Sequence, residues 1–144
     1  MKTICGIDPG KSGAIAVIDG SGVVVETFVD SSIGNTIKDV LTGRDGVYVY
    51  LEKVHSFPNQ GVSSSFAFGR AFGEIIGCLD ALEIPYEFVS PQKWQKGLGL
   101  PKKKDGATEH KRALKILAQQ RFPKQKPTLK TADALLIADY GRKR

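Results

Sequence analysis

The sequence lacks the features that stabilise small secreted domains and those that hold proteins in membranes. It contains only two cysteines, Cys5 and Cys78, which form no C-x-x-C pair and have no histidine beside them. A zinc site and a disulfide framework are therefore excluded as the basis of the fold, and a reducing cytoplasm is the expected location. No segment approaches the roughly 20 apolar residues of a membrane span, and the first apolar run is too short for a signal peptide. We expect a single domain over residues 1–144 with no membrane partner.

A nucleotide-binding loop is also missing, although the stretch GIDPGKSG at residues 6–13 looks like one at first. A Walker A loop, Gly-x-x-x-x-Gly-Lys-[Ser/Thr], would need its leading glycine at the position of Cys5. We therefore expect no nucleotide cofactor. The stretch does contain Asp8, which ends an apolar run and precedes a Pro-Gly turn. This pattern predicts a carboxylate at the point where a strand leaves a sheet.

Positive charge is concentrated in the last third of the chain. The net charge is +6, but Pro91 to Lys130 holds 12 Lys and Arg against only Asp105 and Glu109. This segment carries a local excess of +10, so the remaining residues sum to −4. Such segregation indicates a polyanionic partner contacted by the basic segment. The alternative interpretation is a basic surface that is merely solvated.

Apolar periodicity predicts a definite order of strands and helices. Three antiparallel strands are followed by a helix, a strand, a crossover helix, a parallel strand and further helices. This is the order of the ribonuclease H-like fold, so we predict an α/β domain with a five-stranded mixed sheet flanked by helices. The expected strands are 2–8, 13–19, 23–29, 47–52 and 84–90, and the expected helices are 31–43, 62–82, 109–121 and 131–144.

Two acids end strands that this order places side by side at the centre of the sheet. Asp8 ends the first strand and Glu52 ends the fourth, and open α/β sheets place their sites at the carboxyl ends of strands. Two neighbouring carboxylates raise each other's pKa unless a cation neutralises them. Because all the ligands would be oxygen atoms, Mg²⁺ is the expected cofactor and Mn²⁺ its expected substitute.

We expect the third acid of this site to be Asp133, which opens the apolar run of the last helix. Asp139 is its competitor, but six residues at 100° each place Asp139 about 120° away around the helix. The alternative role for Asp133 is a favourable interaction with the N-terminal end of the helix dipole.

Gly69, Gly73 and Gly77 recur every four residues within the helix expected over residues 62–82. Each costs about 1 kcal/mol relative to alanine inside a helix, so the stripe indicates close approach of another backbone. The sequence leaves two candidates open, which are the parent sheet and a second subunit. The second would make the protein a homodimer.

Four segments resemble the RuvC family of Holliday-junction resolvases, particularly its bacteriophage-type members: GIDPGKSGAIAVID, VYLEKVHSFPNQGVSSSFAFGRAFGEIIG, IPYEFVSPQKWQK and KTADALLIADYG. They cover most of the chain in the order of the family. The resemblance implies a homodimeric, Mg²⁺-dependent endonuclease that cuts four-way junctions or other branched DNA, leaving 5′-phosphate and 3′-hydroxyl ends. It implies a bacterial or phage-infected cytoplasm as the setting. It also implies that Asp8, Glu52 and Asp133 are metal ligands, with two ions in each active site.

One position departs from the pattern of the family. Three residues before the last aspartate, on the same helical face, the family commonly has a fourth acid or a histidine, and here that residue is Lys130. A charged lysine cannot ligate Mg²⁺, so we expect Lys130 to be a catalytic residue that holds the scissile phosphate. The alternative is an ordinary exposed lysine.

Several residues are expected to contact DNA. His55 and Phe57 follow Glu52 and could stack on an unpaired base, although ordinary loop packing is an equal alternative for Phe57. The indole of Trp94 is expected in the core. Contacts to the DNA backbone are expected from basic side chains that supply affinity without sequence information: Lys93, Lys96, Lys102, Lys103, Lys104, Lys111 and Arg112.

Two other functions remain compatible with parts of the pattern. A branched-DNA-binding module without catalytic activity would explain Lys130. An actin-like or sugar-kinase phosphotransferase also uses this fold, but such proteins need two copies of it, and 144 residues hold only one.

Overall fold

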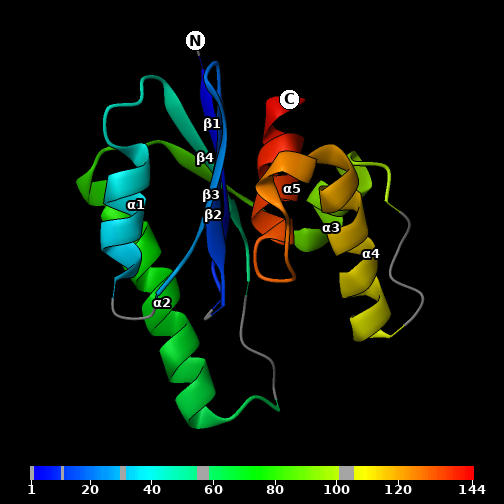
Figure 1. Cartoon of the computed structure of the whole chain (residues 1–144). Coiled ribbons are helices and arrows are strands. Elements are labelled where there is room, and N and C mark those ends of the chain that lie inside the picture. Colours follow the sequence, from blue (N-terminus) through cyan, green and yellow to red (C-terminus); the bar gives the residue numbers. More distant parts are fainter. Residues whose placement is uncertain (1, 11, 30–31, 55–58, 101–105) are drawn as a thin grey trace.

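Five strands form one mixed sheet: β1 (Thr3–Asp8), β2 (Ala14–Asp19), β3 (Gly22–Thr27), β4 (Val47–Glu52) and β5 (Tyr86–Val89) (Figure 1). The computed structural model describes residues 2–10, 12–29, 32–54, 59–100 and 106–144. The strand order is β3-β2-β1-β4-β5, so β1 is central. β2 is antiparallel to both β1 and β3, whereas β4 is parallel to both β1 and β5.

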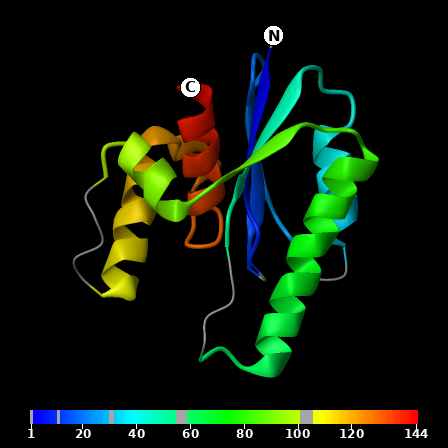
Figure 2. The same ribbon diagram turned by 180° about the vertical axis from the view of Figure 1, so that it is seen from behind.

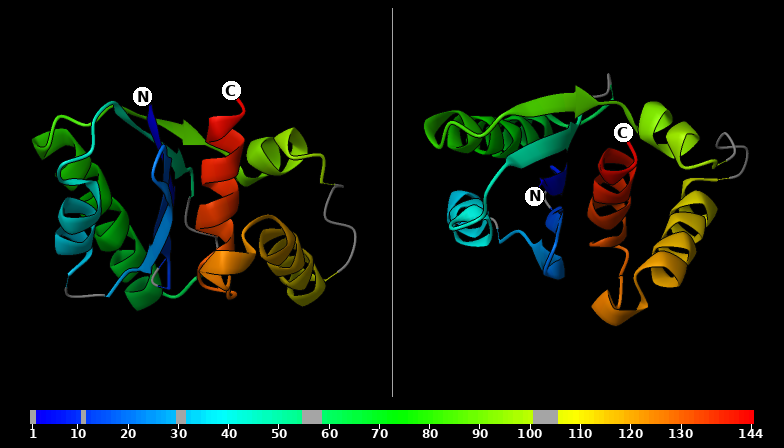
Figure 3. Two further views of the ribbon diagram at one scale, coloured as in Figure 1. Left: turned by 45° about the horizontal axis from the view of Figure 1, so that its top comes forward. Right: turned by 90° about the horizontal axis from the view of Figure 1, so that it is seen from above.

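Helices cover both faces of this sheet, as Figure 3 shows from above. One face carries α1 (Ile33–Leu41) and α2 (Val62–Ala81), and the other carries α5 (Ala132–Arg142). Outside α5 lie α3 (Pro91–Gly97) and α4 (Ala107–Arg121), and a 3₁₀ turn, η1 (Pro123–Gln125), follows α4. The predicted five-stranded mixed sheet flanked by helices is confirmed.

The alternation of side chains along β2 explains why both faces are covered. Ile15 and Val17 lie in the core shared with α1 and α2, whereas Ala14, Ala16 and Ile18 pack with α5. Successive residues of a strand point to opposite faces, so an apolar residue at every position requires a layer on each side. The sequence AIAVID therefore specifies a three-layer arrangement locally.

Small residues let α5 lie unusually close to the sheet. A Cβ atom added to Gly6 on β1 would overlap the backbone of Ala134 and Ala138 on α5. Ala14 and Ala16 on β2, whose side chains are also small, pack in the same buried cluster as Ala134 and Ala138. α5 is buried almost throughout, from Ala134 to Gly141. The position of the first turn of α5 relative to the end of β1 is thus set by backbone-to-backbone contact.

α3 is a helix that the apolar pattern did not predict. Pro91 occupies its first turn, where a missing N–H costs nothing, and the Ser90 hydroxyl accepts a hydrogen bond from the Lys93 N–H at 3.1 Å. These are the start signals of a helix in a segment with only one buried side chain, Trp94. The segment is too short for its apolar residues to show a helical repeat.

α2 extends past the sheet on the side where β1 and β4 end (Figures 1 and 2). Its buried side chains are Ala71, Ile75 and Leu79, while Gly69, Gly73 and Gly77 are exposed. A Cβ atom added at any of these glycines would meet no atom of the described part of the chain within 4 Å, apart from its own helix and chain neighbours. Tight packing of the stripe on the parent sheet, one of the two predicted alternatives, is therefore wrong. Within the described residues, no helix is long and apolar enough to cross a membrane.

Candidate active site

The three predicted acids come from three elements that meet at one edge of the sheet. Asp8 is the last residue of β1, Glu52 is the last of β4, and Asp133 lies in the first turn of α5. Ile7 is paired with Leu51 in the parallel register, so β1 and β4 end at the same level. α5 runs along β1 with its N-terminal end toward this edge (Figure 1).

Burial and mutual repulsion raise the pKa values of these carboxyl groups. Burial, followed by the negative charge of Asp133, raises the pKa of Asp8 to about 7. Burial, followed by the charge of Asp8, raises the pKa of Glu52 to about 8. Burial also raises the pKa of Asp133. The charge of one carboxylate thus changes the pKa of another, as happens between groups that share one site.

Hydrogen bonds hold two of the acids in place. The side chain of Glu52 is only 7% exposed, and its Oε2 accepts a hydrogen bond from the indole Nε1–H of Trp94 at 2.7 Å. Asp8 Oδ1 lies 3.5 Å from the backbone nitrogen of Gly10, in the turn that follows β1. Trp94 is fully buried, which confirms its predicted place in the core. Its bond to Glu52 was not predicted, because nothing in the sequence links α3 to the end of β4.

α4 brings positive charge to the acids. The charge of Lys111 opposes the rise in the pKa of Asp8, Glu52 and Asp133, and His110 does the same for Asp133. Lys111 is itself exposed on α4. The sequence predicted Lys111 only as one of several contacts to the DNA backbone, whereas the fold sets its charge beside the acids. His110 carried no sequence signal, since a lone histidine in a basic segment is usually a surface residue.

The donor set suits a divalent cation, although the side chains do not enclose one as they stand. The charge of Asp133 raises the pKa of Asp8, and the charges of Asp8 and Asp133 raise that of Glu52. Carboxylate oxygens placed together in this way bind Mg²⁺ and Mn²⁺. Within the described part of the chain, no group of three or more His, Cys, Asp or Glu side chains is arranged to hold an ion already. A cation at this edge would therefore require adjustment of the side chains around the backbone positions that the fold sets.

Lys130 is exposed and lies in the turn that precedes α5. Its backbone N–H donates to the Thr128 hydroxyl at 3.2 Å, and Thr128 N–H in turn donates to the Thr131 hydroxyl at 2.9 Å. α5 begins only at Ala132, so Lys130 does not occupy the same helical face as Asp133 in this chain. The turn leaves the ammonium group of Lys130 in solvent.

Asp139, the competitor of Asp133, has a structural role instead. Its side chain is fully buried and forms ion pairs with Arg121, at the end of α4, and with Arg142. Lys143 Nζ lies 3.5 Å from its Oδ2. Burial opposes ionisation, but these bonds to cations prevail and lower the pKa of Asp139. The carboxylate therefore joins α4 to α5 and is not turned to the other acids.

The remaining predicted contacts to DNA divide into two groups. Lys93 and Lys96 on α3 are exposed, as is Arg112 on α4. The other five fall outside the described residues: His55, Phe57, Lys102, Lys103 and Lys104.

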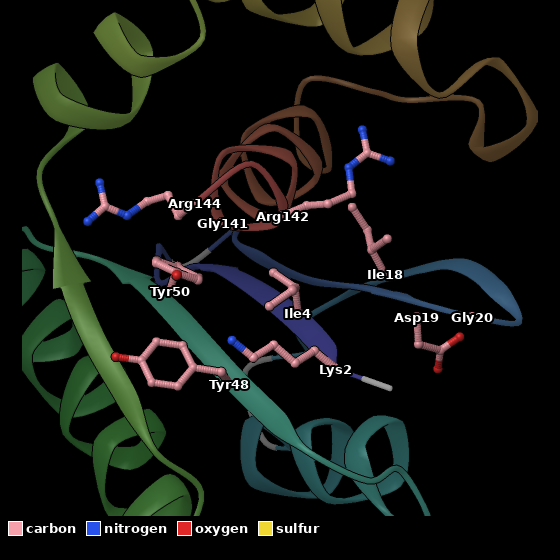
Figure 4. Close-up of a pocket in the computed structure, with 10 residues that line it drawn as sticks. All are labelled: Lys2, Ile4, Ile18, Asp19, Gly20, Tyr48, Tyr50, Gly141, Arg142 and Arg144. Atoms are coloured by element: carbon pink, nitrogen blue, oxygen red, sulfur yellow. The ribbon is translucent and has the colours of Figure 1, made fainter.

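A cavity of about 460 Å³ lies at the opposite end of the sheet from the acids, near the start of β1 and the end of α5 (Figure 4). Ile4, Tyr48 and Tyr50 form an apolar wall, and Lys2 and Arg144 lie at the same cavity. The three acids are not among its lining residues. The cavity therefore does not belong to the candidate active site.

The raised pKa values predict that the metal-free protein loses stability as the pH rises. Between about pH 4 and pH 8 the native state retains protons at Asp8 and Glu52 that the unfolded chain has released. The free energy of unfolding, measured with urea in EDTA, should fall over this range and then level off. Glu52→Gln should weaken the fall, whereas Asp39→Asn, which removes an exposed acid on α1, should not. A Glu52→Gln profile identical to wild type would contradict the raised pKa of Glu52 in the folded protein.

No protein-family model and no curated protein sequence matches the chain. Among solved structures, Thermus thermophilus RuvC in complex with a Holliday junction substrate matches with a TM-score of 0.66 at 16% identity, covering 98% of this chain and 95% of that one. A further T. thermophilus RuvC structure has the same identity and coverage with a TM-score of 0.65. Fowlpox virus resolvase, in complex with Holliday junction DNA, gives 0.59 at 16% identity over 98% and 99% of the two chains. The chain therefore has the ribonuclease H-like fold of the RuvC-type Holliday-junction resolvases.

Proposed function

We propose that the chain is a divalent-cation-dependent endonuclease that cleaves branched DNA, above all four-way junctions. The observation that carries the proposal is the group of three acids that meet at the ends of β1 and β4 and raise the pKa values of Asp8 and Glu52. Such a group has a high electrostatic cost that a purely structural site would avoid. The choice of branched DNA is supported by the likeness in fold to two resolvases solved with Holliday junction DNA.

Asp8, Glu52 and Asp133 hold the cations, proposed as two Mg²⁺ ions per site with Mn²⁺ as a substitute. When bound, such ions activate water as the nucleophile and stabilise the leaving 3′ oxygen. The three carboxylates stand on three separate elements, so the fold sets their spacing before the substrate arrives. Hydrolysis leaves 5′-phosphate and 3′-hydroxyl ends and needs no covalent intermediate with the protein.

Two lysines are assigned to the scissile phosphate, which needs positive charge beside three acids. Lys111 is exposed on α4, and its charge acts on all three carboxylates. Lys130 is exposed in the turn before α5, three residues from Asp133. We assign Lys130 as a second catalytic cation, in place of a fourth metal ligand.

The arms of the junction lie along the basic segment that follows β5. Exposed Lys93, Lys96 and Arg112 contact phosphates, and the run Lys102, Lys103 and Lys104 between α3 and α4 extends this surface in sequence. These contacts supply affinity through counterion release and carry no base information. His55 and Phe57, which follow Glu52 in the chain, are proposed to stack on bases at the branch point.

We assign a homodimer, because two opposed cuts need two active sites. The glycine stripe of α2 is exposed, and no side chain of the described residues lies within 4 Å of a Cβ atom added at these glycines. Phe66 and Val62 on the same helix are 75% and 88% exposed. Close packing of a second copy of α2 on the stripe would offset the free energy that three glycines cost a helix. The proposed setting of the protein is a bacterial or phage-infected cytoplasm, which is consistent with two cysteines that form no disulfide.

Removing single carboxylate charges should separate cleavage from binding. Asp8→Asn, Glu52→Gln and Asp133→Asn keep the shape of each side chain but remove a cation ligand, so cleavage should fall by at least about 100-fold. The assay compares four-way junction, fork, flap and linear duplex on a gel, in Mg²⁺ and in EDTA. Junction binding should stay within about twofold of wild type.

Asp39→Asn is the matched control, since it removes the same charge from an exposed position on α1. It should cleave like wild type. Near-normal cleavage by any of the three site variants in saturating Mg²⁺ would remove that acid from the site. Tight junction binding by the wild type without cleavage in Mg²⁺ or Mn²⁺ would favour the non-catalytic module.

The dimer assignment predicts that Gly73→Leu yields a folded monomer. The fold of one subunit should tolerate the larger side chain, because the space beside Gly73 is empty, while a partner helix would be pushed away. Sedimentation measures the mass, and Asn35→Leu at an exposed position of α1 is the control for added apolar surface. A Gly73→Leu protein that still sediments as a dimer would place the interface elsewhere.

A further inference from the structure

Trp94 is the only tryptophan in the chain, and it is a core residue that also contacts the candidate site. The indole is fully buried in a cluster with Val89, Leu136 and Tyr140, between the end of the sheet and α5. An indole N–H buried in this way needs an acceptor. The acceptor here is the carboxylate of Glu52, 2.7 Å away, one of the three acids of the candidate site.

The helix that carries Trp94 is itself held firmly. The Ser90 hydroxyl caps its start, and the N–H of Leu98 donates to the Trp94 carbonyl at 3.1 Å. The next residue, Gln95, makes a second contact toward the site, because its Oε1 lies 2.9 Å from His110 Nε2. Consecutive residues of α3 thus reach Glu52 on β4 and His110 on α4.

A carboxylate at the end of a strand can rotate about its side-chain bonds unless something fixes it. The Trp94 bond holds the Oε2 atom of Glu52 from a buried indole, and so restricts rotation of the carboxylate. A cation site built from three elements depends on such outer partners, and their loss typically lowers metal affinity or activity by about 10–100-fold.

We propose that Trp94 is a positioning residue that orients Glu52 for cation binding, with α3 as its rigid support. This inference rests on the proposed function, since it assigns an outer partner to the same cation site. The indole acts through Glu52 and touches neither cation nor DNA. We therefore expect the affinity for cations to depend on the indole N–H of Trp94. The affinity for DNA should not depend on it.

The test is Trp94→Phe, which keeps an aromatic ring in the cluster and removes only the donor and part of the volume. Calorimetry with Mn²⁺ in the absence of DNA should show affinity at least about 10-fold below wild type. The Mg²⁺ concentration for half-maximal junction cleavage should rise by a similar factor, with excess Mg²⁺ restoring most of the rate. Junction affinity in EDTA should stay within about twofold of wild type.

Tyr140→Phe is the matched control, because it also removes a polar group from the same cluster. The Tyr140 hydroxyl accepts from Arg144 at 3.0 Å and does not contact Glu52. It should leave Mn²⁺ affinity unchanged. If Trp94→Phe binds Mn²⁺ like wild type, or if Tyr140→Phe weakens binding equally, the positioning role is wrong while the nuclease proposal stands. If the wild type itself neither binds Mn²⁺ nor cleaves, both proposals fail.

The wild-type protein provides a second measurement that does not depend on the folding of Trp94→Phe. Because Trp94 is the only tryptophan, indole emission comes from this residue alone, and its surroundings include the Glu52 carboxylate. Mg²⁺ should change the emission with the same midpoint as cleavage, and the change should vanish in Glu52→Gln. Emission that stays constant across the Mg²⁺ range that activates cleavage would overturn the inference.

Discussion

Three carboxylates at one edge of a sheet repel one another, and the fold keeps them there by packing α5 against β1. Asp8 and Glu52 would lie side by side on any parallel pair of these strands. Asp133 joins them only because Gly6 lets the backbone of α5 approach β1 at Ala134 and Ala138. Bulk at Gly6 would displace the helix and with it the third acid. The site is thus a consequence of close backbone packing in the layer behind it.

Asp133 and Asp139 lie on the same helix, but their surroundings shift their pKa values in opposite directions. Asp139 is fully buried, but Arg121 and Arg142 neutralise it and hold its pKa low, so it adds to the attachment of α4. Among the described residues Asp133, at the other end of α5, forms no such ion pair, and its pKa is raised by burial. An acid that is buried without a paired cation is costly to a fold, and such cost is typical of sites that serve a ligand.

The ion pair that joins α4 to α5 also helps to explain where the positive charge of the basic segment lies. Arg121 at the end of α4 is tied to Asp139, and Gln95 on α3 contacts His110 near the start of α4. The first contact joins α4 to α5 and the second joins α4 to α3, and in this position the charge of Lys111 acts on the acids. One lysine of the basic segment, Lys111, is thus exposed to solvent and also lowers the pKa values of the candidate site.

The sequence predicted what depends on local pattern and failed where tertiary contacts decide. The strand order and the places of Asp8 and Glu52 followed from apolar runs ended by acids, and the angle around the helix separated Asp133 from Asp139. The bond from Trp94 to Glu52 spans 42 residues, so no local pattern could reveal it. Likewise, Lys111 was indistinguishable from its basic neighbours until α4 was placed. The residues around His55 and Lys103 lie outside the described part, and their roles remain predictions.

The central claim is that Asp8, Glu52 and Asp133 together bind the cations that cleave DNA. It is tested most directly by anomalous X-ray scattering from Mn²⁺ in crystals of the protein bound to a four-way junction. The account predicts Mn²⁺ peaks within direct bonding distance of oxygen atoms from all three acids, next to a phosphate of the DNA. Peaks confined to other acids, or an ordered junction with no Mn²⁺ at this edge of the sheet, would contradict it.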